Sequence, residues 1–351
     1  MGKVGIGGNH PISVQSMTNT PTHNVKATLH QIEKLKKNGC EIVRLAVPDE
    51  KSAKAIVEIR RSTDIPLIAD IHFDYRLALK ALETGINGLR INPGNIGKKK
   101  DVEAVVKSAL ERNVPIRIGV NAGSLEKDVL TKFGHPTPEA MVESALKHIR
   151  ILEKLNFDKI KVSLKSSNAL DTINAYRLLA KKCDYPFHLG ITEAGTVFSG
   201  SILSAVALGI LLHEGIGDTI RVSLSGPPEE EVRVGWEILK ALELRSRGVK
   251  IISCPTCARK QFDVAKVAAT LEEKLAYVTA PITIAVMGCV VNGPGEARLA
   301  DIGVAGGKSG KSALYIKGRI KSRIDNNSIV SVILEEIQSL ISTKKAEDFI
   351  T

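Results

Sequence analysis

Residues 115–121 read Pro115-Ile-Arg-Ile-Gly-Val-Asn121, and the two faces of this segment differ in polarity. Side chains of a β-strand point alternately to opposite faces, so Arg117, Gly119 and Asn121 share one face while isoleucine and valine share the other. A parallel strand covered by helices on both faces is normally a continuous apolar run. This segment therefore indicates a strand that packs against helices on one face and borders an enclosed polar space on the other.

Strands of this kind recur along the first part of the chain, separated by amphipathic segments. We expect strands at residues 12–17, 42–47, 66–72, 88–93, 115–121, 159–166, 187–192 and 219–225. We expect helices at residues 28–38, 52–62, 75–84, 102–112, 138–155, 172–182, 201–213 and 229–246. Strict alternation of strand and helix favours parallel pairing, and eight units in about 245 residues predict a (β/α)8 TIM barrel. A doubly wound open α/β sheet is the alternative.

Polar residues recur on the inward face of these strands, near the C-terminal ends where barrel active sites lie. They are Arg44, Asp70, His72, Arg90, Asn92, Arg117, Asn121, Lys165, Arg221 and Ser223. Each charged residue could instead form a structural ion pair with a neighbouring carboxylate. Few acidic residues share this face, so the five cations predict a binding site for a small molecule with two or more negative charges.

Three residues are candidates for proton chemistry. Glu193 follows the seventh strand, where acid–base residues of barrels are commonly presented, and Asp70 and His72 belong to the third. Lys165 has an alternative role as a Schiff-base lysine of a barrel aldolase, because neighbouring cations would lower its pKa.

The remaining residues predict a second, small α+β domain, which divides the chain into residues 1–246 and 247–351. We expect helices at 264–278 and 328–341 and strands at 282–287, 301–305 and 313–317. The segment Ala305-Gly-Gly-Lys-Ser-Gly-Lys-Ser312 fits a relaxed phosphate-binding loop. That loop requires a helix directly after it, whereas Ala313-Leu-Tyr-Ile316 is typical of a strand, so we predict a hairpin turn.

The second domain carries three of the five cysteines, in Ser253-Cys-Pro-Thr-Cys257 and Met287-Gly-Cys-Val-Val-Asn-Gly-Pro-Gly-Glu296. Three thiolates and a nearby carboxylate suggest a metal centre with one exchangeable position. We expect a turn at residues 292–295 to bring Glu296 toward Cys289. An iron–sulfur cluster, a zinc site and a reactive thiol site all remain open. Cys40 and Cys183 are expected to be packed small side chains.

Composition limits the class of protein. The 351 residues are 43% hydrophobic and carry a net charge of +11, which favours anionic partners. We find no signal, transit or membrane-spanning pattern and therefore expect a cytoplasmic protein. Only 4% of the residues are aromatic, which argues against the alternative of a zinc-dependent nucleic-acid-binding module.

Several motifs together resemble one family, the 4-hydroxy-3-methylbut-2-enyl diphosphate synthases of the methylerythritol phosphate route to isoprenoids. Besides the two cysteine segments, they are Val14-Gln-Ser-Met-Thr-Asn-Thr20, Val43-Arg-Leu-Ala-Val-Pro48, Ala69-Asp-Ile-His72, Leu89-Arg-Ile-Asn-Pro-Gly-Asn-Ile-Gly97, Ile116-Arg-Ile-Gly-Val-Asn-Ala-Gly-Ser-Leu125 and His188-Leu-Gly-Ile-Thr-Glu-Ala-Gly195. The resemblance is to the bacterial two-domain form. Ala258 stands where the family pattern has Gly, and the N-terminus is short.

The resemblance implies a [4Fe-4S] cluster held by Cys254, Cys257, Cys289 and Glu296, and a two-electron reductive ring opening of 2-C-methyl-D-erythritol 2,4-cyclodiphosphate with loss of water. It implies flavodoxin or ferredoxin as electron donor. By matching position Glu193 would give a proton near the departing hydroxyl, and the diphosphate would be held by Arg44, Arg90, Arg117, Asn121, Lys165, Arg221 and Ser223. We expect Glu296 to leave the iron when substrate arrives, because Gly295 permits unusual backbone geometry.

Barrel topology also predicts an assembly. The last barrel helix runs antiparallel to its strand, so the linker near Arg247 leaves at the face opposite the expected active site. A short linker cannot easily return the second domain to its own barrel mouth. We therefore predict a head-to-tail homodimer, in which each second domain caps the partner's barrel.

Overall fold

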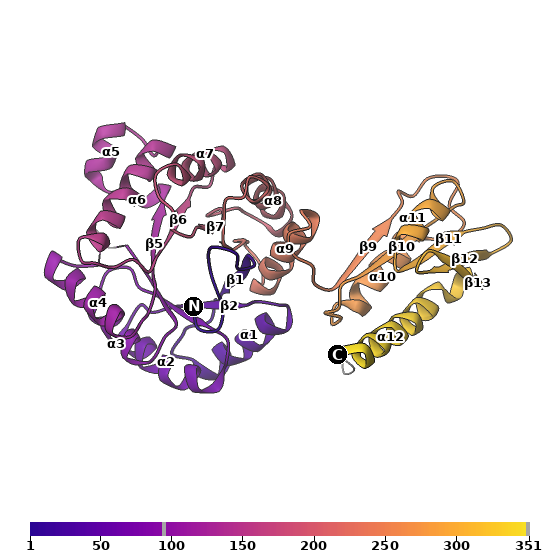
Figure 1. Cartoon of the computed structure of the whole chain (residues 1–351), viewed down its shortest axis with the longest axis horizontal. Coiled ribbons are helices and arrows are strands. Elements are labelled where there is room, and N and C mark those ends of the chain that lie inside the picture. Colours follow the sequence, from indigo (N-terminus) through magenta and orange to yellow (C-terminus); the bar gives the residue numbers. More distant parts are fainter. Residues whose placement is uncertain (93–95, 349–351) are drawn as a thin grey trace. The chain divides into compact units, whose positions relative to one another are not determined.

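The computed structural model describes residues 1–92 and 96–348 of the chain (Figure 1). Contacts divide the chain into two compact units, residues 1–245 and 246–351, and each is described by itself.

The first unit is built on eight parallel strands in the order β6-β5-β4-β3-β2-β1-β8-β7. A parallel bridge between Val162 of β6 and Phe187, which precedes β7, joins the two ends of the sheet. The barrel prediction is therefore confirmed, and the open sheet is excluded. The predicted end of the fourth strand at Pro93 lies outside the described residues. The strands are β1 (Ser13–Met17), β2 (Ile42–Ala46), β3 (Leu67–Asp70), β4 (Gly88–Ile91), β5 (Ile116–Asn121), β6 (Ile160–Lys165), β7 (His188–Leu189) and β8 (Thr219–Ile220).

Helices surround the barrel and bury their apolar faces against the outer faces of the strands (Figure 1). Five of them begin at a side chain that accepts a backbone N–H of the first turn, namely Asn24, Asp49, Asp74, Thr137 and Asn168. The helices are α1 (Val25–Lys37), α2 (Glu50–Ser62), α3 (Tyr75–Glu83), α4 (Lys99–Glu111), α5 (Lys127–Phe133), α6 (Pro138–Glu153), α7 (Ala169–Ala180), α8 (Val197–His213) and α9 (Pro228–Ala241). Short α5 was not predicted, and α9 ends before the predicted residue 246.

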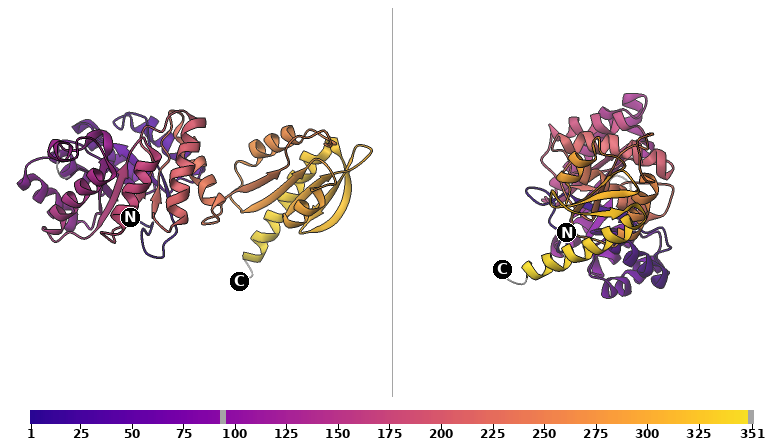
Figure 2. Two further views of the ribbon diagram at one scale, coloured as in Figure 1. Left: turned by 90° about the horizontal axis from the view of Figure 1, so that it is seen from above. Right: turned by 90° about the vertical axis from the view of Figure 1, so that its right-hand side faces the viewer.

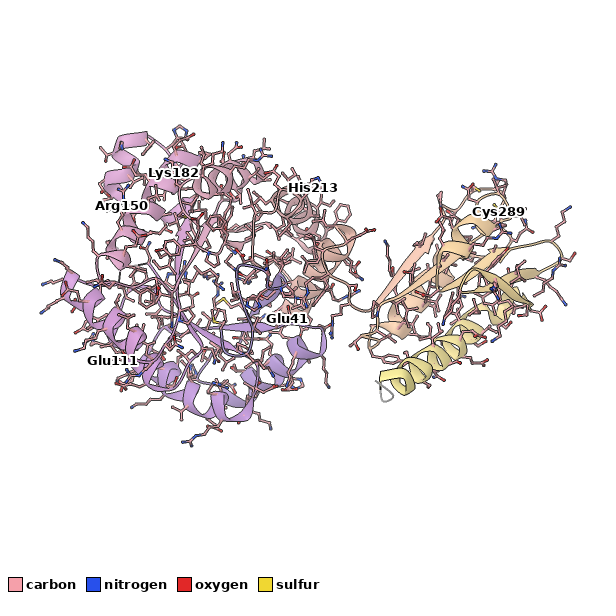
Figure 3. The ribbon with its side chains drawn as sticks, viewed as in Figure 1. Glu41, Glu111, Arg150, Lys182, His213 and Cys289 are labelled. Carbon is pink, nitrogen blue, oxygen red and sulfur yellow. The ribbon has the colours of Figure 1, made fainter. Side chains whose placement is uncertain are left out.

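Arg245, just after α9, forms several contacts with the barrel. Its Nη1 donates to the carbonyl oxygen of Ile12 at 2.8 Å and to Glu41 at 2.7 Å, and its guanidinium lies 4.5 Å from the ring centroid of Trp236. Glu41, labelled in Figure 3, directly precedes β2, and Ile12 directly precedes β1. The chain therefore leaves the first unit at the N-terminal ends of the strands.

The second unit is a mixed five-stranded sheet in the order β13-β12-β11-β10-β9. Figure 2 shows this unit in two further views. Strands β9 (Val249–Ser253), β10 (Ile282–Met287) and β11 (Ile302–Gly306) are parallel, whereas β12 (Lys311–Ile316) and β13 (Arg319–Asp325) pair antiparallel. Helices α10 (Val264–Leu275) and α12 (Ile329–Asp348) share the main apolar cluster with one face of the sheet. Helix α11 (Gly293–Leu299) packs on the opposite face through Ala297. Strands β9 and β13 were not predicted.

The glycine-rich segment at residues 305–312 forms a hairpin turn, as predicted. It joins antiparallel β11 and β12, with Gly306 paired to Ser312 and left-handed backbone at Ser309 and Gly310. No helix follows the turn, so the segment lacks the geometry of a phosphate-binding loop.

Among the residues that the structure describes, no helix is long and apolar enough to span a bilayer.

Candidate functional site

The inward faces of neighbouring strands align charged residues side by side. Asp70 of β3 is in register with Arg90 of β4, which pairs with Arg117 of β5, which in turn pairs with Lys161 of β6. All four side chains are buried. Parallel register partners project to the same face, so the barrel interior contains a continuous polar row.

Asp70 is the counter-ion of two cations, Arg90 in this row and Arg44 in β2. Its carboxylate lies 3.0 Å from Nη1 of Arg90 and 3.5 Å from Nε of Arg44, and His72 contacts both Asp70, at 3.4 Å, and Arg90, at 2.8 Å. Burial opposes ionisation of Asp70, but Arg44, His72 and the other nearby arginines outweigh it and hold its pKa well below the usual range. Asp70 is thus an ionised residue inside the cationic cluster.

A second carboxylate, Glu231 in the first turn of α9, supports Arg221. Arg221 donates to Glu231 through Nη2 at 3.0 Å and through Nε at 3.2 Å. The expectation that the cations lack acidic partners was therefore too strong, because Arg44, Arg90 and Arg221 all have one. Glu231 was missed because it lies in the acidic run at residues 229–231, which is typical of a solvated helix start.

Of the five predicted cations, Arg117 and Lys165 are the two that no carboxylate approaches within ion-pair distance among the described residues. Arg117 is 2% exposed, and neither its Nε nor its Nη1 has a hydrogen-bond partner there. Burial, then Arg44 and Arg90, lower the pKa of Arg117. Burial, then Arg117 and Arg221, likewise lower the pKa of Lys165 far below its ordinary value. Both side chains would gain from an anion inserted among them.

Two glycines make room for these long side chains. A Cβ atom on Gly119 would lie 2.6 Å from Nε of Arg90, and one on Gly190 would lie 2.5 Å from Nζ of Lys165. Such distances are far below van der Waals contact. The side chains of Arg90 and Lys165 can therefore pack here only because both positions are glycine.

Glu193 lies in the loop after β7, with an exposed side chain and a left-handed backbone at φ 54°. A glutamate resists this conformation, and strain of this kind clusters at functional sites. The other predicted residues belong to the same barrel: Asn92 is buried, while Asn121 and Ser223 are half-buried. The roles of all these residues remain predictions.

Two further buried titratable groups were not predicted as site residues. Lys161 is 3% exposed, and its Nζ has no hydrogen-bond partner in the described part of the chain. Burial and then Arg117 lower its pKa to about 7, against the attraction of Asp218. His188 is fully buried and shares a 2.7 Å hydrogen bond with Thr219. Both alternate with apolar neighbours along their strands, the signal by which the sequence predicts that Lys161 faces inward together with Lys165.

The second unit gathers the cysteine loops at one edge of its sheet. Because β9 and β10 are parallel, Cys254 and Cys257 after β9 lie at the same edge as Cys289 after β10. Figure 3 labels Cys289 in its loop. The backbone N–H of Gly288 donates to Sγ of Cys254 at 3.2 Å, so the two loops touch. All three thiols are half-buried.

Glu296 lies in the first turn of α11 and is half-buried. The expected turn at residues 292–295 is wrong: the helix begins at Gly293, because Pro294 is compatible with a first helical turn and lacks the N–H that would be unsatisfied there. Gly295 is helical and has no left-handed backbone, which removes the reason given for movement of Glu296.

The cysteine edge offers the donors that an iron–sulfur cluster takes. In the described ranges, no three His, Cys, Asp or Glu side chains converge on one metal position. The donor set is nevertheless suitable, because three thiols share one edge and Glu296 lies in the helix that follows the Cys289 loop.

A closed parallel barrel with unpaired interior cations, followed by a domain with three thiols on one edge, defines a class of two-domain barrel enzymes that act on anionic small molecules. The chain belongs to the GcpE family. Residues 1–236 match the GcpE TIM-barrel domain, and residues 250–339 match the GcpE protein C-terminal domain. The resemblance inferred from the motifs is thereby confirmed.

Similar proteins cover almost the whole chain. The 4-hydroxy-3-methylbut-2-en-1-yl diphosphate synthase (flavodoxin) of Geobacter sulfurreducens is 59% identical over 344 residues, 98% of this chain and 97% of that protein. Proteins of the same name from Caldanaerobacter subterraneus and Lawsonia intracellularis are 56% and 57% identical, over 97% of this chain and 96% and 95% of theirs. These names support neither an aldolase nor a nucleic-acid-binding module.

Proposed function

We propose that this chain converts 2-C-methyl-D-erythritol 2,4-cyclodiphosphate to 4-hydroxy-3-methylbut-2-enyl diphosphate, a step in isoprenoid precursor biosynthesis. The bond between carbon and one ring phosphate oxygen breaks, and a hydroxyl group leaves as water. Counted on fully protonated species, two electrons and two protons balance the reaction. The full-length similarity to synthases of this name supports the assignment.

The proposal rests on Arg117 and Lys165, the two predicted cations that have no carboxylate partner. A cyclic diphosphate brings two phosphate groups into one small ring and so offers two negative charges close together. Arg117 would contact it through planar N–H donors, and Lys165 would add a compact charge. Arg44, Arg90 and Arg221, already held by carboxylates, would bind with fixed orientation. Asn92, Asn121 and Ser223 would complete the hydrogen bonds.

Glu193 is the proposed proton donor to the departing hydroxyl. It is exposed at the C-terminal ends of the strands, where substrate enters, and its backbone strain fits a side chain held for function. Asp70 is a poor proton donor, because its neighbours keep it ionised. We assign Asp70 to positioning Arg44 and Arg90, and His72 to the same cluster.

Cys254, Cys257, Cys289 and Glu296 would hold a [4Fe-4S] cluster in the second unit. When bound, the cluster supplies electrons one at a time, which the side chains of this protein cannot do. The relatives' name indicates flavodoxin as donor, and ferredoxin is the other expectation. Cysteine ligands of this kind must stay reduced, and we therefore propose a cytoplasmic location.

Anaerobic purification followed by turnover of the cyclic diphosphate with dithionite and methyl viologen tests the function. We expect about four irons and four sulfides per chain and formation of the linear diphosphate. Cys289→Ser should lower iron content and abolish turnover, whereas Cys183→Ser should change neither. A colourless protein that binds only zinc would refute the proposal.

We further propose the head-to-tail homodimer. Arg245 anchors the exit of the chain at the N-terminal ends of the strands, opposite the proposed site. Helix α8 also exposes an apolar stripe at spacing of one helical turn, formed by Phe198, Ile202, Val206 and Ile210, which a second copy would cover. Mixing inactive Cys289→Ser and Glu193→Gln chains should restore part of the activity in heterodimers. Absence of rescue in verified heterodimers would refute the arrangement.

A further inference from the structure

The hairpin turn between β11 and β12 lies beside the cysteine loops. Strand β11 is parallel to β10, so its C-terminal end and the turn at residues 307–310 share the edge that carries Cys289. A Cβ on Gly306 would lie 2.3 Å from the carbonyl oxygen of Gly288 and 3.3 Å from the nitrogen of Cys289. Backbone therefore meets backbone here, and the turn adjoins the proposed cluster site directly.

Asn326 ties this turn to the cysteine loops. Its backbone N–H donates to the carbonyl oxygen of Gly310 at 2.9 Å, and its Oδ1 accepts from the Ser312 hydroxyl at 2.7 Å. Its Nδ2 donates to the carbonyl oxygen of Gln261 at 2.9 Å, and the N–H of Gln261 donates to the carbonyl oxygen of Gly288 at 2.8 Å. One chain of hydrogen bonds thus fixes the turn relative to both cysteine segments.

Four exposed cations surround this frame, and we call them the cysteine-edge basic patch: Arg259, Lys260, Lys308 and Lys311. Arg259 and Lys260 follow Cys257, while Lys308 lies in the turn and Lys311 directly follows it. None of the four forms an ion pair with a described residue. Val290 and Val291, next to Cys289, are 64% and 63% exposed. Protein interfaces typically have an apolar centre and a polar rim, and a charged rim serves to attract a partner of opposite charge.

We propose that the cysteine-edge basic patch is the docking surface for flavodoxin, an acidic flavoprotein. This inference rests on the proposed function and names where its electron donor binds. Each docking event would pass one electron from reduced flavodoxin to the cluster, so two events serve one substrate molecule. The four cations would attract and orient the acidic protein, and the two valines would allow close approach beside Cys289 during the interval when this edge is not against the partner's barrel. The glycine-rich turn that resembles a nucleotide loop thereby has a role in protein recognition.

Charge reversal at the turn tests the proposal in the cluster-loaded, full-length protein. Lys308→Glu/Lys311→Glu should raise the KM for reduced flavodoxin about tenfold or more at low ionic strength and reduce the salt dependence of kcat/KM. Its kcat with methyl viologen should equal that of the unchanged protein, since a small artificial donor needs no docking surface. Iron content verifies that the cluster is still held.

A matched control carries the same charge change at the opposite end of strand β12. Lys317→Glu/Arg319→Glu alters the turn between β12 and β13, where no cysteine lies, and should leave the KM for flavodoxin within about twofold. Equal effects of both variants, or no effect of the first, would overturn the docking proposal. Absence of viologen-driven turnover in the unchanged protein would instead refute the proposed function, so the two failures are distinguishable.

Discussion

Arg221 donates two hydrogen bonds to Glu231, of 3.0 Å from Nη2 and 3.2 Å from Nε. Glu231 also accepts from the hydroxyl of Ser16 at 2.8 Å and from the backbone N–H of Leu224 at 3.2 Å. One buried carboxylate therefore joins β1, the segment after β8 and α9, and aims a guanidinium at the barrel interior. A paired arginine has little freedom left to lose when an anion binds, which favours affinity.

Glu231→Gln should weaken binding of the cyclic diphosphate. The neutral amide keeps the shape of the side chain but loses charge-assisted hydrogen bonds worth about 1.5–3 kcal/mol, so kcat/KM should fall about 10- to 100-fold. The effect should fall mainly on KM, because Arg221 binds rather than reacts. Glu230→Gln, which removes only an exposed pair with Arg233, should change kcat/KM less than twofold. Equal, small effects of both substitutions would contradict the positioning role.

Substrate binding should be coupled to proton uptake at Lys165. Burial and neighbouring arginines hold the pKa of this amine far below its ordinary value, so the free protein gives up this proton more readily than an exposed lysine would. A bound dianion favours the charged form, raises the pKa and draws a proton from the buffer. Affinity should therefore strengthen as pH falls from 9 toward 7.

Calorimetric titration in buffers of different ionisation enthalpy measures this uptake directly. The cyclic diphosphate keeps both phosphate groups ionised throughout this range, so it contributes no protons of its own. Lys165→Met should bind more weakly and lose most of the buffer dependence. A binding enthalpy that is independent of the buffer in the unchanged protein would contradict the prediction.

Lys161 should make the barrel less stable at neutral pH than at high pH. Its pKa is about 7 when folded and about 10.4 when unfolded, so the unfolded state binds more protons between these values. The cost of burying the charge is fully present below pH 7 and disappears as pH rises toward 10.4, a change of about 3–5 kcal/mol. Lys161→Met should thus stabilise the barrel at pH 7, with a gain that shrinks at pH 9.

Urea unfolding followed by the fluorescence of Trp236, the single tryptophan of the chain, reports on the barrel. The control is Lys159→Met, because Lys159 is exposed and directly precedes β6. It should show no pH-dependent gain in stability. A stability difference for Lys161→Met that stays constant between pH 7 and 9 would refute the assigned pKa.

The barrel was predictable because its signals are local and repeated. Alternation along segments such as residues 115–121 defines which side chains point inward, and topology places their C-terminal ends together. The cations Arg117 and Lys165 followed from that pattern alone. Their counter-ions did not, because the pairing of Arg221 with Glu231 joins a strand end to a helix start and depends on packing that no periodicity encodes.

The second unit was less predictable for related reasons. Strand β13 alternates charged residues at a sheet edge, where exposure on both faces hides the apolar signal. Helix α11 begins with Gly293, Pro294 and Gly295, which are typical of a turn, and only packing of Ala297 against the sheet favours the helix. Asn326 links three segments that are far apart in sequence, a role that only the fold reveals.

Gly190→Ala should disturb the site without any conflict with backbone conformation. The added methyl would lie 2.4 Å from the carbonyl oxygen of Arg221 and 2.5 Å from Nζ of Lys165. The carbonyl oxygen belongs to a segment that the bond from the N–H of Arg221 to the carbonyl oxygen of Leu189 holds in place, so both this backbone segment and the lysine amine must shift. We expect a loss of diphosphate affinity of about tenfold or more and a barrel destabilised by about 1–3 kcal/mol.

Gly209→Ala in α8, where the methyl meets nothing within 4 Å, should stabilise the barrel by about 0.5–1 kcal/mol and leave affinity unchanged. Calorimetric titration and urea unfolding of the two variants separate the effects, and normal affinity in Gly190→Ala would show that the amine of Lys165 does not contact the diphosphate.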